Sequence, residues 1–564
     1  MKKIKKWLKN FFFPPVDSPR WVRVLPYAVL GILTIILLTG ATFGWEYTNS
    51  PEFCGESCHT MPPEYTAYLT SPHARIACVD CHIGKGFITT RVTRKAGDLK
   101  HVFATMFHTY EFPIRADALR PARETCEKCH FPEKFSDDSL REIHRFTNDK
   151  DNTPYSIFLT LKTGGGDARQ GLGRGIHWHI QNKVEYLPTD PEEQEIPYIR
   201  VTNADGSMNE YIDVEGQFDP SSVDPAELKE MDCITCHNRI THLVATPEDT
   251  VDKLIAADQI SKDIPEIRRQ AVEAYSKIYS TTEQGLKGIA AIEDYYQTYR
   301  PEYYAANAPK VQQAIAVLQE AYGNSVYPDQ NSDWTTHPNN IGHKDSAGCF
   351  RCHDGKHLDA EQKAIRLECN VCHSIPVVAS PFDFTAKIEL SRGPEPQSHL
   401  NENWITLHNQ AIDSTCANCH TTEDPGGTSN TSFCSNSACH GSVWTYAGFD
   451  APALREVLKD QLPPQPTPAP LPEGGEATYE ASIGPLLQAR CGSCHGDGGI
   501  EGLNVITYET LMKGSESGAV VVPNDPQGSL LVQKQSGDLP HFGQLTPDEL
   551  DLLITWINAG APEK

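Results

Sequence analysis

Every cysteine of this 564-residue chain lies in a motif in which two cysteines are followed directly by a histidine. The two thiols of such a motif can add across the two vinyl groups of one haem, while the histidine binds the iron. The nine pairs are Cys54/Cys58, Cys78/Cys81, Cys126/Cys129, Cys233/Cys236, Cys349/Cys352, Cys369/Cys372, Cys416/Cys419, Cys434/Cys439 and Cys491/Cys494. Disulfides and zinc sites also use paired cysteines, but neither requires a histidine after every pair. The sequence therefore predicts nine covalently bound haem c groups, each with one iron.

Two of the motifs depart from the usual gap of two residues. Three residues separate Cys54 from Cys58, and four separate Cys434 from Cys439. We interpret both as tolerated variants of the same attachment, because a histidine still follows the second cysteine.

A haem iron that only transfers electrons usually has a protein ligand on each side of the ring. Nine of the 22 histidines lie in the motifs and thirteen do not, which is enough for two histidines at each iron. The motif histidines that we expect to bind iron are His82, His130, His237, His353, His373, His420, His440 and His495. The candidates for the opposite side, chosen by their position in the sequence, are His242 after the fourth motif, His337, His343 and His357 around the fifth, and His399 and His408 before the seventh.

Two further candidates lie in a stretch without haem motifs. His177 and His179 alternate with Trp178 in IHWHIQNKVEYL. Alternation predicts a β-strand with both histidines on one face, so either could reach a haem. The stretch IPYIRVTNADGSMNEYI follows, and its Asn-Ala-Asp-Gly predicts a hairpin turn and hence a small sheet.

The net charge of the chain indicates which classes of molecule it can bind. The formal net charge is −25, and the haem propionates would add to it, so repulsion from phosphate disfavours a nucleic-acid partner. Basic or membrane-embedded partners fit better. Only 39% of the residues are hydrophobic, and we expect flat haem rings to supply much of the core.

An uncharged apolar run from Val24 to Trp45 is long enough to cross a bilayer as a helix. Lysines and arginines precede it, so the positive-inside rule places the N-terminus in the cytoplasm. The alternative is a cleaved signal peptide, but the run is too long and lacks a clear small-residue cleavage site. The sequence predicts a single-pass anchor in the inner (cytoplasmic) membrane, with all later residues on the periplasmic side.

The elements that must position the motifs follow from patterns along the chain. Apolar residues recur at three- and four-residue intervals over residues 247–322, which predicts amphipathic helices, and a proline-rich stretch from residue 462 predicts a linker. We expect a mainly α fold with irregular loops packed around haems. The expected segments are 1–48 (basic segment and anchor), 49–245 (four haems, with a β insertion near 150–230), 246–330 (helical spacer), 331–447 (haems five to eight), 448–475 (linker) and 476–564 (an α-helical monohaem domain).

The first half resembles the NapC/NirT family of membrane-anchored tetrahaem quinol dehydrogenases over roughly residues 20–245. The anchor, CGESCHTM, SPHARIACVDCH and CHNRITH carry this resemblance. It implies that the first haem lies at the membrane surface beside a quinol site, with Met61 rather than His59 on its iron. It also implies that His242 serves the second haem and His73 the fourth, which leaves His177 or His179 for the third.

The resemblance also implies a quinol site on the helix after the second motif, in RKAGDLKH. The corresponding residues are Lys95, Asp98, Lys100 and His101. The chain departs from the family where Val102 occupies a position at which an acidic residue is expected. The alternative for this stretch is an ordinary basic helix on lipid headgroups.

The last two segments show further resemblances. The region from CHNRITH through GCFRCHDGKH is similar to extended multihaem relatives of the same family, and the C-terminal segment resembles small monohaem cytochromes. These cytochromes use the methionine of a Met-Pro pair as the sixth ligand. Here the pair is Leu539-Pro540, so His541 is the nearest substitute and Met512 the next.

Together these features favour a cytochrome that oxidises menaquinol or ubiquinol near its first haem and conducts the electrons to other redox proteins or to subunits of a respiratory complex. Two alternatives stay open. One is a wire subunit without a quinol site of its own, and the other is a terminal reductase with an open haem.

Overall fold

The computed structural model describes residues 2–564 except 58–59, 98, 117–118, 133–137, 166–174, 204, 368–370, 381–400, 412–419, 421, 430, 437–439, 441–443, 449–450, 460, 462–476, 493–494, 497–501, 516 and 537–544. Several predicted features therefore lie outside the described residues: the proline-rich linker, Cys58, His59, Asp98, Cys369, His399, Cys416, Cys419, Cys439, Cys494 and His541.

The chain forms two compact units. The first comprises Met1–Lys134, Phe146–Thr153 and Met231–Gly348, and the second comprises Phe135–Arg145, Pro154–Glu230 and Cys349–Lys564. We expected the β insertion to belong with residues 49–245. In the structure it belongs with the residues after Cys349, because two of its strands pair with strands from that later region.

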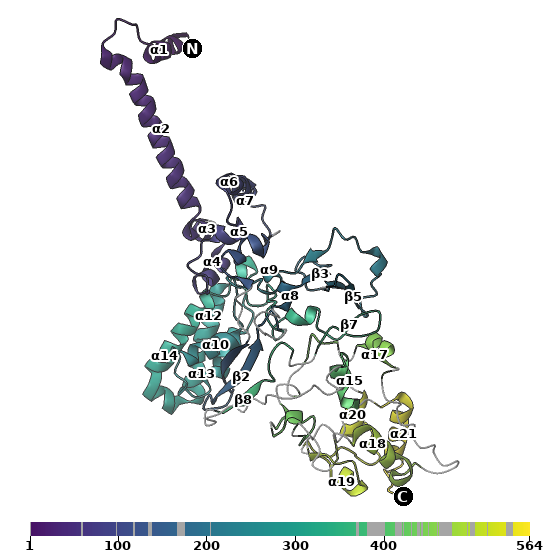
Figure 1. The fold of residues 1–564 in the computed structure, drawn as a ribbon. Helices are drawn as coiled ribbons and strands as arrows, with labels where there is room; N and C mark the ends of the chain where they lie inside the picture. Colours follow the sequence, from purple (N-terminus) through teal and green to yellow (C-terminus); the bar gives the residue numbers. More distant parts are fainter. Residues whose placement is uncertain are drawn as a thin grey trace. The chain divides into compact units, whose positions relative to one another are not determined.

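The first unit begins with helices α1 (Lys2–Phe12) and α2 (Arg20–Thr48). Among the described residues, α2 is the helix that is long and apolar enough to cross a membrane. Figure 1 shows it as one continuous helix. Its 29 residues span about 43 Å at 1.5 Å per residue, which exceeds the hydrocarbon core of a bilayer.

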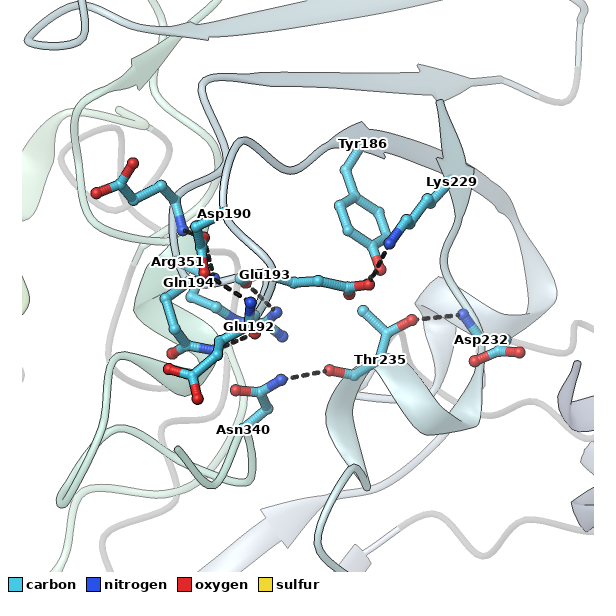
Figure 2. A network of polar contacts seen from close by, with 11 residues as sticks. Tyr186, Asp190, Glu192, Glu193, Gln194, Lys229, Asp232, Thr235, Asn340 and Arg351 are labelled. Atoms are coloured by element: carbon cyan, nitrogen blue, oxygen red, sulfur yellow. Dashed lines mark hydrogen bonds and ion pairs between the residues drawn. The ribbon is translucent and has the colours of Figure 1, made fainter. Parts of the chain in front are cut away.

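Short helical turns carry the first four motifs, separated by irregular loops. They are α3 (Pro51–Glu56), α5 (Cys78–His82), η2 (Cys126–Lys128) and α9 (Cys233–Cys236), with α4 (Pro62–Leu69), α6 (Ile88–Gly97), α7 (Leu99–Phe107) and η1 (Ala122–Glu124) between them. A capping box begins α9: the Asp232 carboxylate accepts from Ile234 N, and Thr235 Oγ1 accepts from Asp232 N at 3.0 Å (Figure 2).

The predicted helical spacer is a bundle in the first unit. Its helices are α10 (Pro247–Ala256), α11 (Ile267–Tyr275), α12 (Thr282–Ala290), α13 (Ile292–Tyr299) and α14 (Pro301–Gly323). Tyr275, Tyr296, Tyr322 and Leu318 are completely buried at its centre. The bundle is thus a conventional apolar core that does not depend on haem rings.

The second unit contains two sheets. The first has the order β1-β2-β8, formed by Asp138–Phe146, Pro154–Lys162 and Val377–Ala379. The second has the order β6-β3-β4-β5-β7, formed by Lys229–Glu230, Lys183–Leu187, Tyr198–Thr202, Met208–Asp213 and His357–Leu358. Glu185 and Arg200 lie opposite each other on β3 and β4, and their side chains form an ion pair of 2.8 Å. This cross-strand pair and the buried Val184 and Tyr186 fix the register.

The strand predicted over IHWHIQ is wrong. Trp178–Gln181 form a single helical turn, α8, and the strand starts only at Lys183. Asn182 explains the change, because its side chain donates to Trp178 O at 2.8 Å and closes the turn. The predicted hairpin lies between β4 and β5, where Gly206 has a φ of +85°.

The remaining elements of the second unit are short, apart from the C-terminal helices. They are η5 (Pro220–Ser222), η7 (Gly348–Arg351), α15 (Trp404–Ala411), η10 (Phe433–Ser435) and α17 (Pro452–Leu458). After the linker come the π-helical turn Tyr479–Ile483, α18 (Gly484–Cys491), α19 (Tyr508–Lys513), α20 (Leu530–Ser536) and α21 (Pro547–Asn558). Trp556, Leu487 and Leu553 are buried in a core that these C-terminal helices form among themselves.

Candidate functional site

Four motif histidines face a second histidine from elsewhere in the chain. The ring centroids of His73 and His130 lie 6.0 Å apart, those of His82 and His242 6.2 Å, those of His179 and His353 5.7 Å, and those of His408 and His440 6.5 Å. Two imidazoles that bind one metal from opposite sides, with bonds of about 2.0 Å, place their centroids about 6.3 Å apart. The donor sets and their separations therefore fit an iron between each pair.

Backbone carbonyls orient several of these rings. The Nδ1 atoms of His179, His242, His408 and His353 lie 2.8, 3.0, 2.5 and 2.6 Å from the carbonyl oxygens of Ile176, Glu64, Ile405 and Arg366, respectively. A carbonyl oxygen can only accept, so Nδ1 carries the proton and Nε2 keeps its lone pair. This is the tautomer that binds a metal through Nε2, with the ring held by its second hydrogen bond.

Burial favours the neutral form of three of these imidazoles. It lowers the pKa of His179 and His242, and it lowers the pKa of His353 to about 4. A protonated imidazole has no lone pair for a metal, so the neutral form is the one that a haem iron requires.

His357, which the sequence placed among the candidates, has different surroundings. It is buried, and both ring nitrogens have hydrogen-bond partners: Nδ1 contacts Asp354 Oδ1 at 2.9 Å and Nε2 contacts Ile196 O at 2.6 Å. It belongs to strand β7, and its contact with Ile196 joins this strand to the inserted segment, so its role as a ligand stays a prediction.

The histidines that lie next to each other in the structure differ from the ligand pairs that the resemblance implies. His242 faces His82 of the second motif, as implied, but His73 faces His130 of the third motif rather than the histidine of the fourth. His179 faces His353 of the fifth motif, not the third. That each facing pair binds one iron stays a prediction.

The other candidates have varied surroundings. Burial lowers the pKa of His337 to about 4, whereas His343 is half-buried. Met61 is half-buried at the start of α4, His237 is exposed, and His495 is buried. The Nδ1 atom of His373 lies 2.6 Å from Ser374 O. Their roles as ligands, like that of the half-buried His420, stay predictions.

The described cysteines are not joined in disulfides, as expected of haem attachment points. They are Cys54, Cys78, Cys81, Cys126, Cys129, Cys233, Cys236, Cys349, Cys352, Cys372, Cys434 and Cys491. Cys54 of the first motif contacts Cys78 of the second, and Cys126 of the third contacts Cys233 of the fourth. The attachment points of the first four motifs are thus gathered in pairs.

Polar contacts hold two other motifs in place. Asn340 Nδ2 donates to Thr235 O at 3.0 Å and secures the helix of the fourth motif in the first unit (Figure 2). In the second unit, Arg351 lies between the cysteines of the fifth motif and donates to Glu193 O at 2.8 Å (Figure 2). Tyr186 and Lys229 each donate to the carboxylate of Glu193 at 2.6 Å, which fixes this loop.

Lys95, the central residue of the expected quinol site, reaches the outer end of α2. Its Nζ lies 2.6 Å from Thr48 O, 3.0 Å from Thr48 Oγ1 and 2.5 Å from Asn49 Oδ1. The same ammonium lies 5.2 Å from the ring centroid of Trp45, within the range of a cation–π contact. Lys100 and His101 are exposed on α7, so among the described candidates Lys95 is the one brought to the helix end.

The residues that receive Lys95 were not among the predicted site residues. Trp45 and Thr48 belong to the expected anchor segment and Asn49 begins the next one, although a tryptophan at the end of an apolar run is itself a signal for the membrane–water interface. Arg94, also on α6, donates to Ile83 O and to Glu124, which ties α6 to the second and third motifs.

Comparison with known proteins locates the chain among cytochromes. The model of the NapC/NirT cytochrome c family, N-terminal region, matches residues 19–122, and that of the Planctomycete cytochrome C family matches residues 491–540. The cytochrome c-type protein ImcH of Geobacter sulfurreducens is 39% identical over 371 residues, which are 64% of this chain and 73% of that protein. The cytochrome c-type protein NrfH of Wolinella succinogenes is 32% identical over 117 residues, 19% of this chain and 66% of that protein. No solved structure matches the chain.

Proposed function

The chain belongs to the NapC/NirT family of membrane-anchored multihaem cytochromes c, and on this premise we propose that it oxidises a membrane quinol at the outer end of α2. The electrons then pass along nine haems to a redox protein on the periplasmic side. The contact of Lys95 with Thr48 and Asn49 is the observation that carries this proposal.

The surroundings of Lys95 suit a quinol. Trp45 marks the depth at which the anchor leaves the hydrocarbon, and Lys95 is half-buried beside it. The two helices that carry the candidate residues, α6 and α7, expose many apolar side chains: Ile88, Val92, Leu99, Val102, Phe103, Met106 and Phe107. A quinol approaching from the bilayer would meet an apolar surface for its tail and a cation for its head group.

The proposed chemistry divides between protein and cofactor. Bound haems supply one-electron acceptors. The positive charge of Lys95 can stabilise the negative charge on a quinol oxygen as that oxygen loses its proton, and a quinol oxygen that displaces one of the present acceptors of Lys95 would take a charge-assisted hydrogen bond from it. Each quinol becomes a quinone by giving up two electrons and two protons, and the protons leave to the periplasm.

The order of the motifs supports conduction through the first unit. Because Cys54 contacts Cys78 and Cys126 contacts Cys233, haems attached to these motifs would be close neighbours in pairs. Electrostatic interaction of Cys81 with Cys126 relates the second motif to the third. Four haems placed in this way would follow one another without a long gap.

The test replaces Lys95 by methionine, which keeps the length of the side chain and removes its charge. In detergent or nanodiscs, we expect Lys95→Met to slow haem reduction by a soluble menaquinol analogue about tenfold or more, because a charge-assisted hydrogen bond contributes roughly 1.5–3 kcal/mol. Reduction by dithionite and the haem content should not change.

Lys277→Met is the matched control, because Lys277 lies on the exposed surface of the helical bundle with only a surface ion pair to Glu273. It should reduce its haems with quinol at the wild-type rate. An equal rate for Lys95→Met and Lys277→Met would overturn the proposal and favour a wire subunit that receives electrons from a separate quinol-oxidising protein.

A further inference from the structure

We propose that the inserted segment His177-Trp178-His179 supplies the distal iron ligands of two neighbouring haems in the second unit: His179 for the haem of the fifth motif and His177 for that of the sixth. This goes beyond quinol oxidation, because it gives the haem-free insertion a role in the later part of the electron path. It rests on the haem attachment that the family and the motifs support, not on the quinol site.

The evidence for His179 is its geometry with His353. The two ring centroids lie 5.7 Å apart with the ring planes at 90°, and each Nδ1 contacts a backbone carbonyl. Both Nε2 atoms therefore have the lone pair that an iron between them would use. Arg351, inside the fifth motif, is buried and donates to Glu193 O, so the insertion and this motif are tied together at a second point (Figure 2).

The evidence for His177 is the strand end that it shares with the sixth motif. Lys162 N donates to Cys372 O at 2.8 Å, Ile176 N donates to Lys162 O at 2.7 Å, and Leu161 forms a β-bridge with His373. The backbone N–H of Lys162 is thus hydrogen-bonded to the sixth motif, and its carbonyl is hydrogen-bonded to Ile176, the residue before His177.

His177 and His373 each make the contact from Nδ1 to a backbone carbonyl that is seen in the facing pairs. His177 Nδ1 lies 2.6 Å from Thr163 O, and His373 Nδ1 lies 2.6 Å from Ser374 O. Each carbonyl fixes the tautomer in which Nε2 is the ligand atom. Both histidines are half-buried and are held by the same strand end.

The helical turn makes the side chains of His177 and His179 point in different directions. His177 is the N-cap of α8, with φ −79° and ψ 5°, and His179 lies in the turn. Side chains two residues apart in a helix point about 200° apart, whereas a strand would point them to one face. One short turn can therefore hold two different haems, and with only Trp178 between the ligands these haems must be neighbours.

The experiment uses the full-length protein with His179→Met, His177→Met and the double variant. Near-infrared magnetic circular dichroism separates bis-histidine from histidine–methionine haem, and a redox titration resolves the potentials. We expect each single variant to convert one haem of nine to histidine–methionine ligation, or to a high-spin form if the thioether does not bind, and the double variant to convert two. Methionine ligation should shift the affected potential upward.

His144→Met is the control, because His144 is an exposed histidine of β1 in the same unit, bonded to Ser156. It should leave all ligand signatures unchanged. If a methionine variant does not accumulate, His179→Gly grown with imidazole replaces it, and the added imidazole should restore the lost low-spin signal.

Unchanged signatures in His179→Met or in His177→Met would overturn the corresponding assignment. These spectra do not depend on quinol turnover, so a failure of the Lys95 experiment would leave them interpretable. Conversely, haem reduction by quinol at the anchor should survive in both histidine variants, because their haems lie later in the path.

Discussion

At the scale of single residues, the facing histidines show how the backbone selects a metal-binding nitrogen. In His179, His242 and His408, a carbonyl three or more residues away receives the proton of Nδ1, which leaves the lone pair on Nε2. His357 differs because its Nε2 also contacts a carbonyl oxygen, that of Ile196. One hydrogen bond thus distinguishes His357 from the facing histidines, and residue type cannot reveal it.

Glu266 provides a residue-scale prediction of pH dependence. Its carboxylate accepts from Tyr295 and binds Arg300 at 2.8 Å and Arg269 at 2.7 Å, and these contacts lower its pKa from 4.5 to about 2. A group whose pKa is depressed on folding stabilises the fold above its unfolded pKa, and this stabilisation is lost as the pH falls through the folded pKa. Glu266→Gln should therefore increase amide hydrogen exchange in α11–α13 at pH 7, and the difference from wild type should shrink between pH 4.5 and about 2.

Glu273→Gln serves as the control for that experiment, because Glu273 lies on the same helix and makes only an exposed pair with Lys277. Its exchange should match the wild type at every pH. A difference for Glu266→Gln that stays constant from pH 7 to pH 2 would show that charge at this position does not stabilise the bundle.

At the scale of elements, one prediction from residue spacing was confirmed and another was wrong. Spacing of three and four residues predicted the helices of the bundle, because their apolar faces bury residues such as Ile267 and Leu318 completely. The alternation at His177-Trp178-His179 predicted a strand where a helical turn forms, because the side chain of Asn182 bonds back to Trp178 O. A pattern of three residues is too short to outweigh one local hydrogen bond.

The sequence could predict the attachment motifs, the anchor and the helical bundle, because each depends on residue types or on local spacing. It could not predict which distal histidine faces which motif. His73 with His130 and His408 with His440 are set by contacts between segments far apart in the chain, and such contacts leave no trace in local spacing. For the same reason the sequence grouped the insertion with residues 49–245, whereas the ring of His179 lies beside that of His353, 174 residues later.

A buried ion pair inside the bundle gives a prediction at this scale, and its arginine also bonds the segment 146–153. Arg268 binds Asp252, whose side chain is 1% exposed, and also donates to Asn148 Oδ1 at 2.6 Å. Arg268→Met would leave the Asp252 carboxylate buried without its guanidinium, which costs roughly 3–5 kcal/mol. We expect a lower thermal midpoint and faster amide exchange in α10 and α11.

Lys277→Met is the control, because Lys277 is 57% exposed and its ion pair with Glu273 lies at the surface. Its cost should stay below about 1 kcal/mol. Equal destabilisation by the two substitutions would contradict a special role for the buried pair.

At the scale of the whole molecule, the nine motifs divide between the two units. Four lie in the first, which also contains the candidate membrane span and the bundle, and five lie in the second, which contains both sheets and the C-terminal helices. The chain passes between the units several times, so neither corresponds to one continuous stretch of sequence. Under the proposed function, the first unit would take up electrons at the membrane and the second would deliver them.

The central claim is that all nine motifs carry haem, including the two with unusual spacing at Cys54/Cys58 and Cys434/Cys439. Intact-mass spectrometry of the denatured full-length protein tests this most directly, because thioether-bound haem stays on the chain when the fold is lost. We predict the mass of the polypeptide plus nine haems, and plus eight for the double variant Cys434→Ala, Cys439→Ala. A wild-type mass that corresponds to eight haems or fewer would contradict the account.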